Sequence, residues 1–139
     1  MSLDRFIYAQ DKYYSTAYKE IRKGKKESHW MWFVFPQING LGYSDISKYF
    51  SIKSRNEARE YLDHPVLGRR LREITDALLD LKTKDPEEIF GPVDARKLHS
   101  CMTLFYLISG EDVFADVLVA YFNAEFDLNT VEIVRVLEV

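Results

Sequence analysis

The residues best suited to chemistry lie in one short segment, residues 28–37, which reads Ser-His-Trp-Met-Trp-Phe-Val-Phe-Pro-Gln. Two indoles could stack on the faces of a planar ring, and His29 could act as a general base or bind that ring. The bulky side chains from Trp30 to Phe35 are too many for one side of a helix, so some must line a cleft or pack on a neighbouring loop. The alternative is that the segment fills the core and each indole N–H finds one acceptor.

Two further groups of polar residues could contribute to a site. His64 precedes a proline at a corner between two expected helices, a place where a histidine usually serves as a structural cap. A polar stripe of roughly 100° runs along a later helix, and it contains Arg96, His99, Ser100 and Thr103, with Lys97 just beyond it. Such a stripe is the water-facing edge of a helix or, alternatively, the wall of a polar pocket. The candidate ligand-binding residues are therefore His29, Trp30, Trp32, Gln37, His64, Lys97, Ser100 and Thr103.

Motifs for established kinds of catalysis are missing from the sequence. The three histidines lack metal-motif spacing, and there is no phosphate loop, dinucleotide fingerprint or nucleophile elbow. Cys101 is the single cysteine and lies in an apolar stretch, so we expect a core thiol rather than a nucleophile. We therefore predict neither a metal nor a cofactor, and no catalytic residue is assigned.

Helices must position the candidate residues. The chain has 139 residues, 47% of them apolar and 14% aromatic, which suits one domain with its own core. Apolar side chains recur at three- and four-residue spacings through most of it, and no two alternating runs flank a hairpin turn. Helices are expected over 3–23, 29–34, 44–50, from 54 to the break at His64, from Pro65 through Leu81, over 94–109, 113–122 and 130–137, with a short helical turn from Asp85 to Gly91. The prediction is an all-α single domain over residues 1–139, an irregular multihelical bundle or superhelix of about eight helices.

Local signals mark the ends of several of these helices. Gly24 suits the left-handed cap after the basic run that closes the first helix. Ser2 and Ser28 are expected to cap the first and second helices, and the spacing from Ser54 to Glu57 is that of a capping box. The residue before Pro65 is pushed out of helical geometry, which separates two helices there.

Composition narrows the classes of partner. Charges sum to −3, so a basic nucleic-acid surface over the whole domain is not expected. No apolar run approaches the roughly 18 residues of a membrane span, and the N-terminal residues do not resemble a signal peptide. With a single cysteine, a reducing cytoplasmic location is expected. The expected partners are an unknown protein or small molecule, and the chain is expected to be a monomer or weak homodimer.

Several stretches of the sequence resemble one known family: Arg5-Phe6 with Ala9-Gln10, His29-Trp30-Met31-Trp32-x-x-Phe35-Pro36-Gln37, Gly40-Leu41-Gly42-x-Ser44, Tyr61-Leu62-x-His64-Pro65-x-Leu67-Gly68-x-Arg70-Leu71, and Ser100-x-Met102-Thr103-Leu104-Phe105. Over nearly its whole length the chain resembles the domain-of-unknown-function family 1810. The resemblance implies a small all-α fold, found mostly in bacteria, without an established activity, so no functional residue is carried over. Members are often labelled "calpastatin", but that inhibitor is a disordered polar chain and this composition is that of a folded core. Family members commonly have a glycine after the Tyr-Phe pair, where this chain has Asn123-Ala124.

Two hypotheses about function follow. The first is a binding or interaction module that presents an aromatic-lined groove to a protein or small ligand. The second is a small enzyme acting on a nucleotide-like or other planar substrate, with His29 as general base and the tryptophans as stacking walls. The enzyme requires that His29, His64 and Ser100 converge in space, whereas the binding module does not, and the first hypothesis is preferred.

Overall fold

The computed structural model describes residues 3–137 and is helical over most of them, with no strand longer than an isolated bridge among these residues. The helices are α1 (Asp4–Lys23), α2 (Met31–Val34), α3 (Asp45–Tyr49), α4 (Arg55–Asp63), α5 (Leu67–Leu79), α6 (Pro86–Ser109), α7 (Asp112–Phe122) and α8 (Leu128–Val136). The all-α prediction is confirmed, and the C-terminal segment is a helix rather than a strand. No helix in the described part of the chain has the length and apolarity needed to cross a membrane.

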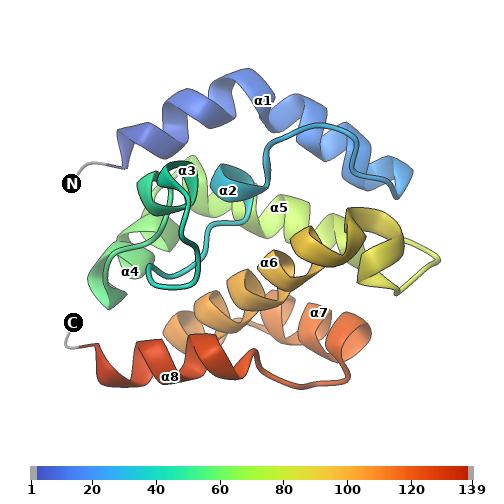
Figure 1. Cartoon of the computed structure of the whole chain (residues 1–139). Coiled ribbons are helices and arrows are strands. Elements are labelled where there is room, and N and C mark those ends of the chain that lie inside the picture. The colour runs from blue at the N-terminus through green and yellow to red at the C-terminus, as the bar shows by residue number, and fades with distance from the viewer. Residues whose placement is uncertain (1–2, 138–139) are drawn as a thin grey trace.

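Helices α5 and α6 make most of the helix–helix contacts. α1 and α8 lie along opposite sides of the molecule, with α5, α6 and α7 between them (Figure 1). α5 packs on α1, α4 and α7, while α6 packs on α4, α7 and α8. The second half of α6 is buried almost all round, including Cys101 and Phe105, as its apolar sequence predicts. Cys101 is a core side chain with no exposed surface, and this burial raises the pKa of its thiol.

The helix ends follow the sequence signals in most places. Gly24 closes α1 in the left-handed conformation at φ 82°, and its N–H bonds to carbonyls of the last turn. The Ser54 hydroxyl accepts a hydrogen bond from the Glu57 N–H at 3.0 Å, so the capping box forms. Ser2, the expected cap of α1, lies outside the described residues.

α6 consists of two helical segments joined at Gly91. Its φ of 79° and ψ of 165° are accessible essentially to glycine alone, so the helical path breaks there. Pro92 then begins the second segment, a position that tolerates the missing proline N–H. The expected separation between residues 85–91 and 94–109 is therefore present as a kink.

The turn after α7 has two successive residues with left-handed backbone. Asn123 has a φ of 55°, which asparagine tolerates, and Ala124 has a φ of 62°. The Ala124 N–H bonds to the Leu118 carbonyl at 3.0 Å, which holds the residue in that conformation. The turn thus keeps a geometry that glycine would adopt with less strain, although the chain has no glycine there.

The long connection from α2 to α4 is closed on itself. Ile38 and Ile52 form an isolated parallel bridge, in which the Ile52 N–H bonds to the Gln37 carbonyl at 2.8 Å. Both isoleucines are buried, so the connection belongs to the core rather than to a free loop. This closure fixes Gln37 and the glycine-containing turn after it opposite α6.

Candidate functional site

Four of the predicted residues come together beside α6. A pocket of about 250 Å³ lies between the turn after α2, the second segment of α6 and the start of α8. Gln37, Lys97 and Ser100 line it, and Trp32 lines a much smaller cavity that shares Gln37 and Ser47 with it. Other lining residues are Leu41, Gly42, Val93, Arg96, Asp127 and Asn129. We call this 250 Å³ space the cationic pocket, for the charges described next.

Two lysines, one on α6 and one after α1, share a carboxylate of α6 beside the pocket. The Asp94 carboxylate is shared by two ammonium groups, at 2.8 Å from Lys26 Nζ and 3.3 Å from Lys97 Nζ. Lys97 Nζ also lies 4.5 Å from the centre of the Trp32 ring, a cation–π contact that fixes its position. Arg96 is exposed and has no hydrogen-bond or ion-pair partner within residues 3–137. One carboxylate thus serves two lysines, and the guanidinium beside them is exposed to solvent.

Ser100 and Thr103 anchor the start of α8 to α6. The Ser100 hydroxyl lies 2.8 Å from that of Thr130, which donates a hydrogen bond to the Asp127 carboxylate. The Thr103 hydroxyl accepts a hydrogen bond from the Asp127 N–H at 2.9 Å and donates one to the His99 carbonyl. Thr103 is completely buried, so it does not reach the pocket. The predicted polar stripe is therefore covered by α8 at these residues and open at Arg96 and Lys97.

Trp30 belongs to the core. Its side chain has no exposed surface on which a ligand ring could stack, and its indole N–H donates to the Glu20 carboxylate at 2.9 Å. The same carboxylate accepts the N–H groups of Glu27 and Ser28 and the Ser28 hydroxyl. Ser28 is therefore held by Glu20 and does not cap α2, which begins only at Met31 instead of His29. His29 precedes the helix, is exposed, and lines none of the pockets described here.

The hydrogen bonds to Glu20 make it strongly acidic. Burial by itself raises the pKa of this carboxyl, but the hydrogen bonds from Ser28, Glu27 and Trp30 outweigh burial and lower the pKa to about 2 from an ordinary 4.5. Since the pKa is lower in the folded chain, the unfolded chain binds the proton more readily. The stabilisation by Glu20 is therefore complete above about pH 4.5 and is lost as the pH falls toward 2.

Glu20→Gln is expected to flatten the pH dependence of stability by about 3 kcal/mol between pH 5 and pH 2. The free energy of unfolding, measured by urea denaturation at several pH values, tests this prediction. The control is Glu27→Gln, because Glu27 is an exposed glutamate nearby whose side chain bonds, within residues 3–137, to Lys23 alone. Parallel pH profiles for wild type and Glu20→Gln would contradict the assignment.

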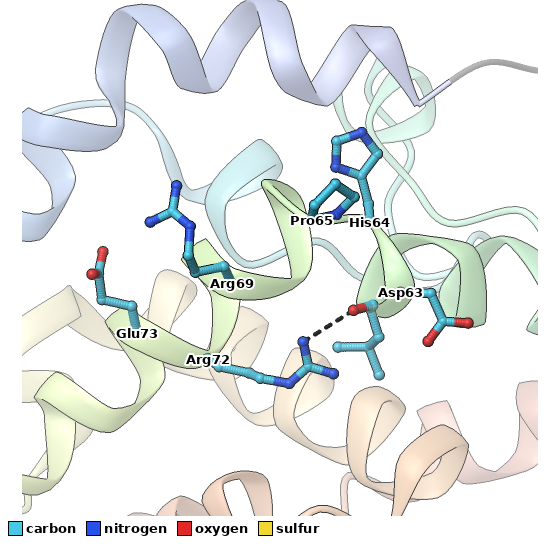
Figure 2. Close-up of a pocket in the computed structure, with 7 residues that line it drawn as sticks. Asp63, His64, Pro65, Arg69, Arg72 and Glu73 are labelled. Atoms are coloured by element: carbon cyan, nitrogen blue, oxygen red, sulfur yellow. Dashed lines mark hydrogen bonds between the residues drawn. The ribbon is translucent and has the colours of Figure 1, made fainter.

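His64 lies in a different, wider depression of about 540 Å³ at the junction of α4 and α5. Its Nδ1 accepts hydrogen bonds from the N–H groups of Val66 and Leu67, so the ring caps the start of α5. Arg72 Nη1 donates a hydrogen bond to the Leu62 carbonyl oxygen, 3.0 Å away, which is the dashed line in Figure 2. Arg72 is also held by both oxygens of the Glu111 carboxylate. The charged groups of this depression are thus largely engaged in structure.

An aromatic-lined groove lies where Phe33 of the predicted aromatic segment meets tyrosines that the sequence reasoning did not single out. A groove of about 340 Å³ between α1 and α3 is lined by Tyr8, Tyr13 and Tyr49, with Phe33 and Phe50 deeper in it. The Tyr8 side chain is 71% exposed. Tyr8 and Tyr13 fall off the apolar stripe of α1, and this is the signal by which they could have been found.

Comparisons with known proteins identify relatives. A family model described as "Protein of unknown function (DUF1810)" matches residues 1–134. The chain is similar to the conserved hypothetical protein Rv1873 from Mycobacterium tuberculosis, whose crystal structure is known. The two sequences are 43% identical, the match covers 96% of each chain, and the TM-score is 0.94. No curated protein matches.

Proposed function

Since this chain belongs to the DUF1810 family, for which no function is described, we propose from its own geometry that it is a binding module for a small anionic ligand. The ligand would occupy the cationic pocket between α6, the start of α8 and the turn after α2. A cytoplasmic location is part of the proposal, because the free, buried Cys101 thiol suits a reducing compartment.

The observation that carries this proposal is the shared carboxylate of Asp94. Lys26 and Lys97 both pair with it, so this carboxylate only partly offsets the charge of Lys97. The lining of the pocket itself holds Lys97 and Arg96 against the carboxylate of Asp127, a net charge of one positive unit. The chain as a whole is negative, with a formal charge of −3, so this local excess is not a consequence of composition. Half-buried charge attracts an opposite charge more strongly than exposed charge does, because water screens it less.

The other wall of the pocket is compatible with an anion. Asp127 is the carboxylate on that side, but it caps α8 and accepts hydrogen bonds from the Thr130 N–H and hydroxyl. Its charge is therefore offset by hydrogen bonds and by the positive end of the helix dipole. Gln37 and Asn129 line the pocket with amides, and neither amide has a hydrogen-bond partner within the described residues. These groups can bind the uncharged parts of a ligand.

The test is calorimetric titration of the full chain with inorganic phosphate, pyrophosphate and citrate. Arg96→Ala is expected to weaken binding at least about tenfold, because hydrogen bonds to charged groups contribute roughly 1.5–3 kcal/mol. Val93→Tyr, which places a ring over the pocket from an exposed position of α6, is expected to weaken it as well. Wild-type affinity is expected to fall as salt is raised.

Matched controls separate this site from general charge effects. Arg69→Ala removes an exposed arginine from the depression beside α5, and Val119→Tyr enlarges an exposed valine of α7. Both variants are expected to bind like the wild type. The proposal fails if none of the three anions binds, or if the control variants weaken binding as much as Arg96→Ala does.

The three residues that the enzyme hypothesis requires do not line one pocket. His64 lines the depression at α4 and α5, Ser100 lines the cationic pocket, and His29 lines neither. Catalysis with His29 as base therefore stays a prediction, and the proposal here is binding.

A further inference from the structure

A second pocket opens on the adjacent face of α6, and Arg96 lines both pockets. This second pocket has a volume of about 270 Å³ and lies between the two segments of α6 and the end of α7. At about 100° per residue, Val93, Lys97 and Ser100 share one face of the helix, and Ala95 and His99 share the next. Arg96 lies between these faces, so the two pockets meet at its side chain.

The walls of the second pocket are flat and mostly apolar. Pro86 comes from the first segment of α6, and Pro92 and Ala95 come from the second, because the break at Gly91 brings residues of both segments to one pocket. The rings of His99 and Phe122 stack in parallel, 3° apart in angle, with centres separated by 4.1 Å. The ring of His99 is held in place by Nε2, which lies 2.7 Å from the Glu125 carbonyl oxygen. Prolines and fixed rings suit a planar, uncharged group.

We propose that the anionic ligand is a nucleotide, with its base in this second pocket and its phosphate in the cationic pocket. The inference rests on the proposed function and specifies its ligand. Each pocket alone is smaller than the roughly 300–1,000 Å³ typical of small-molecule sites, and the two together fall within that range. A guanidinium at the junction can hydrogen-bond a phosphate through its edge and stack on a base through its face.

The experiment compares AMP, adenosine and inorganic phosphate by calorimetric titration. In the wild type, AMP is expected to bind at least about tenfold more tightly than phosphate and than adenosine, because it alone occupies both pockets. Glu87→Trp places an indole in the second pocket from an exposed position and is expected to weaken AMP binding at least about tenfold while phosphate binding is unchanged.

Glu88→Trp is the matched control for this variant. Glu88 is the next residue in the same first turn of α6, is also exposed, and does not line the second pocket. It is expected to bind AMP like the wild type. The nucleotide inference is overturned if AMP binds no more tightly than phosphate, or if adenosine binds as tightly as AMP. It is also overturned if Glu87→Trp and Glu88→Trp weaken AMP binding to the same extent. Absence of phosphate and AMP binding together would instead overturn the proposed function itself.

Discussion

Glu57→Ala is expected to lower the free energy of unfolding by about 3–5 kcal/mol, because it removes a carboxylate that pairs with a buried guanidinium. Arg5 is only 5% exposed, and its Nη2 lies 2.8 Å from Glu57 Oε1. Arg5 also donates to the carbonyls of Tyr49 and Ser51, so the same cation joins α1 to the end of the connection before α4. Glu57 further accepts the Lys53 N–H at 2.9 Å. Removing the carboxylate therefore disturbs several elements at once.

Urea denaturation of the full chain measures this effect. Glu60→Ala on the same helix is the control, since Glu60 is exposed, and a surface change of this kind usually stays within about 0.5 kcal/mol. The double variant Arg5→Met/Glu57→Leu is expected to recover much of the loss, because it removes both charges together. Equal stabilities for Glu57→Ala and Glu60→Ala would refute the role assigned to the ion pair.

Gly68→Ala is expected to destabilise the fold by about 3 kcal/mol or more, at the upper end of the cost of overpacking. A Cβ at this position would lie 2.0 Å from the Leu62 carbonyl oxygen, an atom of the backbone that cannot rotate away. The turn is already fixed, because the Gly68 N–H bonds to the His64 carbonyl and His64 caps α5. In an ordinary helix the same change would stabilise the fold by up to about 1 kcal/mol. A loss of stability would therefore itself indicate a steric clash at this position.

Gly110→Ala separates this steric effect from backbone strain. Gly110 has a φ of 67°, but a Cβ there meets nothing within 4 Å. Its alanine variant is expected to lose only about 1–2 kcal/mol, the cost of a left-handed alanine. Thermal and urea denaturation of both variants test the order, and a Gly68→Ala loss no larger than that of Gly110→Ala would contradict the prediction.

Periodicity and end signals predict most of this fold because they act within a few residues. The amphipathic stripe of α5, the glycine end of α1 and the break at Gly91 all appear where the pattern indicates. The start of α2 differs because Ser28 has two possible roles, and the choice depends on Glu20 one helix earlier. Such a choice between a local cap and a distant carboxylate depends on tertiary structure.

The candidate site is predicted only in part for a similar reason. Gln37, Lys97 and Ser100 do line one pocket, although their spacing in the sequence does not predict that they lie close together. Trp30 and Thr103 have the same residue types that a site would use, but buried partners bind them instead. The second pocket beside Arg96 depends on the kink angle and on the end of α7, which the sequence pattern does not specify.

The attachment of α8 has a consequence for local unfolding. α8 fully buries only Thr130 and Val134, packs Ile133 partly against the core, and exposes Leu128 and Val136. Polar contacts to α6 and to Arg55 add to its attachment. A helix with so little buried apolar surface opens at a lower free energy than the core, so its amide hydrogens exchange through sub-global opening. Because Asp127 and Asn129 line the cationic pocket, the ligand proposed for it would be released when α8 opens. Occupancy therefore slows hydrogen exchange throughout α8, including turns that the ligand never touches.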